Sequence, residues 1–103
     1  MIRGTTSLNV FHTNRDLRGA KIYITYMQNN RTVVEKSNDS MTIEENRIAV
    51  RLRQDEMLRF SKNPRSKVQM QIRYITPNGE ASASNIMETT VNNVLKEGVI
   101  TYA

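Results

Sequence analysis

The chain has 103 residues, a length that suits one domain and is too short for two ordinary ones. It contains no cysteine, which excludes disulfides and thiolate metal sites, and no apolar stretch approaches the ~20 residues of a membrane-spanning helix. The net charge is +5 and 38% of the residues are hydrophobic, a balance typical of a globular protein. We therefore expect a single globular domain over residues 1–103 that does not associate with membranes.

The first predicted strand spans about Ser7–Thr13 and is followed by a charged loop over residues 14–19. Lys21–Gln28 is rich in β-branched and aromatic residues, which strands favour, and large side chains occupy both of its faces. We expect this second strand to be a central one in a two-layer fold. Asn29-Asn30 can adopt positive φ and predicts a tight hairpin turn into a return strand, Arg31–Lys36.

After a loop at residues 37–40, a short strand is expected at Met41–Glu44, with a turn at residues 45–46. Arg47–Arg53 alternates cleanly, so that its branched apolar side chains share one face and its arginines share the other. Residues 54–60 break this period, which predicts one helical turn with Asp55 as its cap. A basic loop follows at residues 61–66.

The longest strand-like stretch is Lys67–Val91, which alternates up to Tyr74 and then meets a turn at residues 76–79. The return segment contains two adjacent large residues, Ile86 and Met87, which predict either a bulge or a side chain that faces a partner. Residues 92–97 suit a second short helical turn, with Gly98 as its C-terminal cap.

About seven short strands, no long helix and no repeat predict an antiparallel all-β fold, either a sandwich or a small barrel. We favour a β-sandwich of immunoglobulin-like type that lacks the Cys-Trp-Cys signature of antibody domains. We also expect the methionines to belong to its core, namely Met27, Met41, Met57, Met70 and Met87.

Residues that could carry chemistry are few. His12 is the only histidine, and the sequence pairs it with no evident nucleophile or orienting carboxylate. Neighbouring acids such as Glu44-Glu45 point to opposite faces of a strand, and Asp55-Glu56 suits the start of a helix. The four glycines are too far apart to cradle a phosphate. We therefore expect no catalytic, cofactor or metal site, and a non-enzymatic protein without a small-molecule substrate.

The excess positive charge lies in one part of the chain. Residues 47–67 contain seven basic and two acidic residues, whereas the remainder contains eight of each. This pattern is typical of a solvated arginine face that protects a strand edge, of a protein interface, or of a nucleic-acid patch. The candidate partner-binding residues are Arg51, Arg53, Arg59, Lys62, Arg65 and Lys67.

Several stretches resemble a family of short proteins encoded in temperate phages and prophages of clostridia-like bacteria. They are residues 1–6, 52–60, 68–73, Gly79 with 83–86, and Val91 with 94–100. Ser7-Leu8 departs from the Thr-Pro that commonly follows the opening, and Arg53 and Met57 replace expected threonines. The resemblance implies a phage or phage-tail-like gene product and identifies no catalytic residues.

Two hypotheses follow from these observations. The first is a structural or accessory component of a phage particle or tail-like assembly, which packs against other subunits and against its own copies through strand edges. The alternative is a small binding protein inside the infected cell, a regulator or host-defence inhibitor whose basic segment grips nucleic acid or an acidic partner. Either would work in the bacterial host cytoplasm, and the first would then enter the particle.

Overall fold

The stretches of alternating sequence form the strands of the computed structural model, which describes residues 1–2, 4–63 and 65–92. The strands are β1 (Ser7–His12), β2 (Lys21–Gln28), β3 (Arg31–Ser37), β4 (Met41–Ile43), β5 (Arg47–Leu52), β6 (Val68–Ile75), β7 (Ala81–Ala83) and β8 (Met87–Thr89). The two short helical elements are η1 (Asn38–Ser40), a 3₁₀ turn, and α1 (Gln54–Met57). Among the described residues, no helix has the length and apolar character needed to cross a bilayer.

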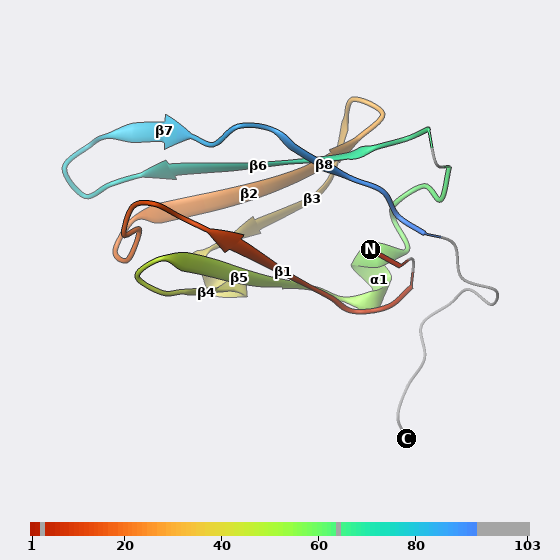
Figure 1. Cartoon of the computed structure of the whole chain (residues 1–103), viewed down its shortest axis with the longest axis horizontal. Helices are drawn as coiled ribbons and strands as arrows, with labels where there is room; N and C mark the ends of the chain where they lie inside the picture. Colours follow the sequence, from red (N-terminus) through yellow and green to blue (C-terminus); the bar gives the residue numbers. More distant parts are fainter. Residues whose placement is uncertain (3, 64, 93–103) are drawn as a thin grey trace, which may run out of the picture.

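Two antiparallel sheets pack face to face, as the two layers of ribbon in Figure 1 show. The smaller sheet has the order β1-β5-β4. The larger sheet has the order β3-β2-β6-β7, and β8 also pairs with β6. The prediction of an all-β sandwich is confirmed, and so is the central position of β2, which pairs with β3 on one side and β6 on the other.

The order of the strands is that of an immunoglobulin-like sandwich. In that fold, strands B, E and D form one sheet and strands C′, C, F and G form the other. The order β1-β5-β4 corresponds to B-E-D, and β3-β2-β6-β7 corresponds to C′-C-F-G. Strand A of the fold would lie beside β1, but no described strand takes that position, because β1 pairs only with β5. Ile2 instead forms an isolated parallel bridge with Asn92.

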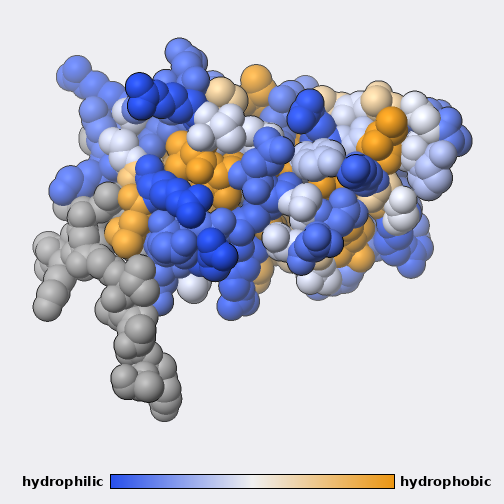
Figure 2. Space-filling view, turned by 180° about the vertical axis from the view of Figure 1, so that it is seen from behind, coloured by the Kyte–Doolittle hydropathy of each residue, from blue (hydrophilic) through white to orange (hydrophobic). Residues whose placement is uncertain are grey.

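The core lies between the sheets and follows the period of two. Fully buried side chains alternate along β2, β5 and β6, so that each strand supplies every second residue to the interior. The largest fully buried side chains are Tyr26 on β2 and Phe60, which follows α1, and they meet edge to face with ring centroids 6.3 Å apart. Of the methionines expected in the core, Met57 and Met70 are buried, and Met41 and Met87 are partly buried and pack against the core. The expectation for Met27 is wrong, because it lies on the face of β2 opposite to the buried residues. The side of the molecule in Figure 2 is mainly hydrophilic, with smaller apolar areas between.

Turn chemistry also matches the sequence in two places. Asn29 and Asn30 both have positive φ, 54° and 61°, and join β2 to β3 as a tight hairpin. Gly79 leaves the turn after β6 at a φ of 90°. The return segment is less regular than a single strand because it contains an extra residue. Arg73 pairs with Ala83, but Met70 pairs with Met87 rather than with residue 86, so a bulge separates β7 from β8.

One expected cap is wrong. Asp55 lies inside α1 and does not cap it. The carboxylate of Glu56 instead reaches back and accepts a hydrogen bond from the backbone N–H of Arg53, with 2.9 Å between the heavy atoms. Glu56 takes this role because its side chain is turned inward against the core, whereas that of Asp55 is exposed. The helical turn expected over residues 92–97 and its cap at Gly98 lie outside the described residues, apart from Asn92.

Candidate functional site

Among the described residues, none pairs with the outer edge of β1 in the smaller sheet. The backbone N–H of Thr13 donates to the carbonyl of Asn46, 2.9 Å away, which fixes the side of the chain that faces β5. Antiparallel strands alternate in bonding direction, so every second residue back from Thr13 also faces β5. The residues between them, Leu8, Val10 and His12, therefore point their N–H and C=O groups toward the free edge. Such a row of groups is a template for pairing with another strand.

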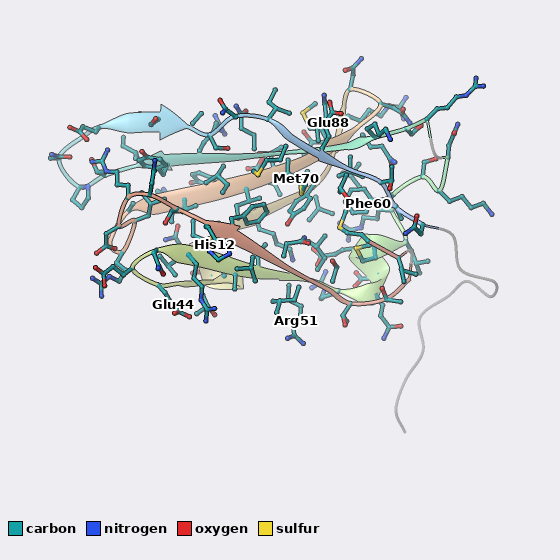
Figure 3. The ribbon with its side chains drawn as sticks, in the orientation of Figure 1. His12, Glu44, Arg51, Phe60, Met70 and Glu88 are labelled. Carbon is teal, nitrogen blue, oxygen red and sulfur yellow. The ribbon has the colours of Figure 1, made fainter. Side chains whose placement is uncertain are left out.

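The side chains of this edge strand are also unusual. Leu8 is 57% exposed and Val10 is 42% exposed, and both lie on the outer face of the sheet. Val10 is opposite Ala49 on β5, while Leu8 is opposite Arg51. We call Leu8, Val10 and Ala49 the β1 face. It is an apolar strip bordered by an arginine, and Figure 3 shows the Arg51 side chain pointing away from the sandwich.

A cleft of about 620 Å³ opens beside the same strand. One wall comes from β1 and the loop after it, and the other comes from β6, β7 and the bulged segment up to Met87. Figure 1 is viewed from this side, with β1 below and the β7–β8 segment above. The floor is apolar and includes Phe11, Leu17 and Ile72, while Ser82 and Ser84 contribute polar groups. We call this feature the edge cleft.

One ion pair lies at the mouth of the edge cleft. Arg15 and His12 line the cleft, and no carboxylate is among its lining residues. The Arg15 guanidinium lies 5.8 Å from the centroid of the Tyr74 ring and forms a salt bridge of 2.6 Å with the carboxylate of Glu80, which does not line the cleft. His12 is exposed on β1, opposite Arg47. The charge of Arg15 is therefore already compensated by Glu80.

The edge strand is held firmly to the core despite its free side. The Asn9 side-chain amide donates a hydrogen bond to the Tyr26 hydroxyl, with 2.8 Å between the atoms. Burial raises the pKa of Tyr26 to about 12, and the bond from Asn9 lowers it by a smaller amount. The phenol is therefore neutral at physiological pH and acts as a fixed acceptor for the strand.

The candidate basic residues do not form one surface. Arg51 lies on the outer face of the smaller sheet, beside Leu8 and the β4 residue Thr42. Arg53 and Arg59 both pair with Asp55, at 3.2 Å and 3.7 Å respectively. Although burial acts to raise the pKa of Asp55, the bond and charge of Arg53 lower it below its usual value. These pairs partly neutralise the basic segment next to α1.

The other basic residues gather at one end of the sandwich. Lys62, Arg65 and Lys67 are exposed in the loop between α1 and β6. Arg59 lines a shallow hollow together with Arg31 from β3, which the sequence interpretation did not include. We call these five residues, Arg31, Arg59, Lys62, Arg65 and Lys67, the cationic end.

A buried glutamine positions this loop. The Gln28 side chain donates to the carbonyls of Ser61 and Ser66, at 3.0 Å and 2.8 Å, and accepts from the N–H of Ser61 at 2.6 Å. Gln28 is 4% exposed, and it satisfies three backbone groups that no strand pairs. The loop of the cationic end is therefore fixed to β2 by hydrogen bonds on both sides of Lys62 and Arg65.

The remaining polar candidates have structural contacts. Glu44 pairs with Arg47 at 2.8 Å, and Glu56 pairs with Lys36 inside the sandwich. Within residues 1–2, 4–63 and 65–92, no group of three His, Asp or Glu side chains gathers as a metal site would require. No family model, curated protein or solved structure matches the chain.

Proposed function

We propose that the protein is a non-enzymatic structural or accessory subunit of a larger assembly and acts by packing against other proteins. The observation that carries the proposal is the exposed apolar edge strand, β1, with Leu8 and Val10 on its outer face. The resemblance of the sequence to small phage proteins favours a phage particle or tail-like assembly as the setting.

Edge strands of monomeric proteins usually carry charges or a covering loop, because an apolar free edge promotes association. The β1 face has the opposite character at its centre, where Val10 is opposite Ala49. A partner that covers this strip would remove apolar surface from water at about 25 cal/mol per Å². Arg51 at the border would favour a partner with an acidic rim.

Sedimentation of particles from lysed producer cells, followed by antibody detection of the protein, tests this function. We expect the wild type to sediment with particles and Leu8→Glu to stay in the soluble fraction. Thr32→Glu is the matched control, since Thr32 is exposed on β3 in the other sheet and does not adjoin the β1 face. A protein that is a monodisperse monomer by light scattering and never sediments with particles would refute the assembly function.

The cationic end supports a second candidate, a small intracellular binding protein that acts on nucleic acid or an acidic partner. Five basic side chains gather there, from β3, from the turn after α1 and from the loop that precedes β6. If the ligand is a duplex, its affinity should fall with salt by a log–log slope of roughly −0.9 per phosphate neutralised. Fluorescence anisotropy with a 20-base-pair duplex at about 50 mM salt tests this. Arg65→Glu should abolish binding and Arg51→Glu should not, whereas the absence of wild-type binding would exclude nucleic acid.

A further inference from the structure

We propose that the edge cleft accepts one extended segment of a partner protein, which adds to the smaller sheet as a strand beside β1. This inference rests on the proposed assembly function and names the site and the kind of contact through which the assembly forms. Two independent features carry it: the backbone groups of β1 that no described strand pairs, and the shape and apolar lining of the cleft.

The outward backbone groups of β1 can pair with an extended strand but not with a helix or a flat surface. Leu8, Val10 and His12 each direct one N–H and one C=O toward the free edge. Residues two apart in a strand are roughly 6.8 Å apart, so an extended segment of about five residues can pair with all three. Strand addition of this kind obtains affinity from main-chain bonds and specificity from alternate side chains.

The larger sheet extends past β1 and limits what can bind there. The smaller sheet ends at β1, whereas the larger one continues to β7 and β8, whose segment forms the opposite wall of the cleft. A second copy that paired its own β1 with this edge would bring its own β7–β8 segment against the overhanging one. A single strand avoids this clash and takes the position of strand A in the immunoglobulin-like order.

The cleft accommodates the inward side chains of such a strand. In an added strand, alternate residues would point between the sheets, toward Phe11, Leu17 and Ile72. These three residues are already buried core members, and so an apolar side chain placed on them would extend the existing core. A volume of about 620 Å³ is within the range of roughly 300–1,000 Å³ that proteins use for ligand pockets.

The polar groups at the cleft do not select a charged partner. Arg15 lines the cleft just after β1 ends, but its guanidinium already pairs with the Glu80 carboxylate at 2.6 Å. No carboxylate lines the cleft. The segment that fits is therefore extended and apolar at alternate positions.

A peptide selection on the full chain tests the proposal. The probe is a library of random ten-residue peptides displayed on yeast, from which binders are enriched and then synthesised. We expect enriched sequences to alternate apolar and polar residues. Binding should slow amide hydrogen exchange at Val10 and His12 at least ten-fold, a change that packing of side chains on the outer face would not produce.

Three variants separate the backbone from the side chains. Val10→Pro removes the edge N–H and should weaken the selected peptides at least ten-fold, whereas Val10→Thr keeps it and should stay within about two-fold. Ser82→Trp should also weaken binding ten-fold or more, because Ser82 lines the cleft and the indole would fill it. Circular dichroism checks that each variant is folded. The hydrogen-exchange measurement is made on the wild type, so it tests the proposal even if a variant fails to fold.

Several outcomes would overturn the proposal. The absence of enriched peptides, equal binding to Val10→Pro, or unchanged exchange at the edge amides would each exclude strand addition here. If Val10→Pro still sediments with particles while Leu8→Glu does not, the assembly function stands and the strand site fails. A wild-type homodimer that Val10→Pro dissociates would assign the strand to a second copy and contradict the partner proposed.

Discussion

The two lateral edges of this sandwich differ in how they are closed. At one edge the chain passes from β3 through η1 to β4 and so links the two sheets covalently. At the other edge β1 and the β7–β8 segment face each other across a cleft, with no described strand between them.

The closed edge also contains the most demanding polar contacts. Lys36 on β3 donates to the carboxylate of Glu56 in α1 at 2.7 Å, and both side chains are less than 10% exposed. The Asn38 side chain continues the β2–β3 pairing, since it accepts from the N–H of Ile22 and donates to the carbonyl of Ala20. These side chains are all hydrogen-bonded, whereas three residues of β1 direct their backbone N–H and C=O groups toward the free edge. The comparison places the buried polar contacts at the closed edge and the backbone groups that no described strand pairs at the open one, where we propose that a partner binds.

The largest effect should come from Lys36→Met, which removes one member of the buried pair. The buried Glu56 carboxylate would then keep only the exposed Arg53 guanidinium, 3.6 Å away, as a counter-charge. Breaking a buried pair typically costs about 3–5 kcal/mol of unfolding free energy, and we expect a loss at the lower end of that range. Urea denaturation followed by circular dichroism measures this loss.

The double variant Lys36→Met, Glu56→Gln is the control for that prediction. Gln at position 56 carries no charge and keeps an oxygen that can accept from Arg53, as Glu56 does. Most of the lost stability should return. A double variant as unstable as the single one would show that the Lys36 side chain contributes through packing rather than through its charge.

Proline placed on the two strands of the smaller sheet gives the next largest difference. The N–H of Glu44 bonds to the carbonyl of Arg47, so Arg47 and, two residues on, Ala49 direct their backbone groups toward β4. The N–H of Val10 faces the free edge, as shown above for β1. Ala49→Pro loses a ladder bond inside the sheet and should cost about 3 kcal/mol or more. Val10→Pro loses none and should cost about 1 kcal/mol. Equal losses in thermal or urea unfolding would contradict the assignment of β1 as a free edge.

Asn38→Ala should have a smaller effect, a loss of about 1–3 kcal/mol, because it leaves two backbone groups at the closed edge without their partners. The measurement is again the free energy of unfolding in urea. Asn38→Asp is the informative control: it keeps the oxygen that accepts from Ile22 and loses the donor to Ala20, so its loss should be intermediate. A loss under about 0.5 kcal/mol for Asn38→Ala would mean that water replaces both bonds.

The sequence predicts the regular parts of this fold because they depend on local patterns. The period of two gives the bounds of β2 correctly, and the Asn29-Asn30 turn follows from the positive φ that asparagine tolerates. The bulge between β7 and β8 was one of two alternatives, since two adjacent large residues cannot both face the core of a regular strand.

The features of the candidate sites depend on contacts between distant segments and could not be predicted. Nothing local shows that β1 is an edge, although Leu8 and Val10 are out of phase with the buried Phe11 and could have suggested an apolar outer face. The basic segment is one run in sequence, but Arg51 lies on the face of a strand whereas Lys62 lies in a loop at the end of the sandwich. Gln28 is in phase with the buried residues of β2, which was the available signal for an inward polar anchor.

The pH dependence of stability should give the smallest effect and sharpen the comparison. Although burial acts to raise the pKa of Glu56, the bonds from the Arg53 N–H and the Lys36 ammonium outweigh it and lower the pKa below its ordinary 4.5. A carboxyl with a lowered pKa in the folded state binds protons more readily when unfolded, so it stabilises the fold above pH 4.5. This contribution is lost as the pH falls through the folded-state value.

Urea unfolding between pH 7 and pH 3 should therefore show a plateau and then a decline that begins near pH 5. Asp16 contributes to the same decline at lower pH, because its hydrogen bonds with Arg18 lower its pKa to about 2, and Asp16→Asn removes that share. In Lys36→Met the burial of Glu56 remains while the ammonium is gone, which should raise its pKa and flatten the acid dependence. If the decline in stability is unchanged in Lys36→Met, it arises from exposed carboxylates. The buried Lys36–Glu56 pair would then not be the source of stability at the closed edge.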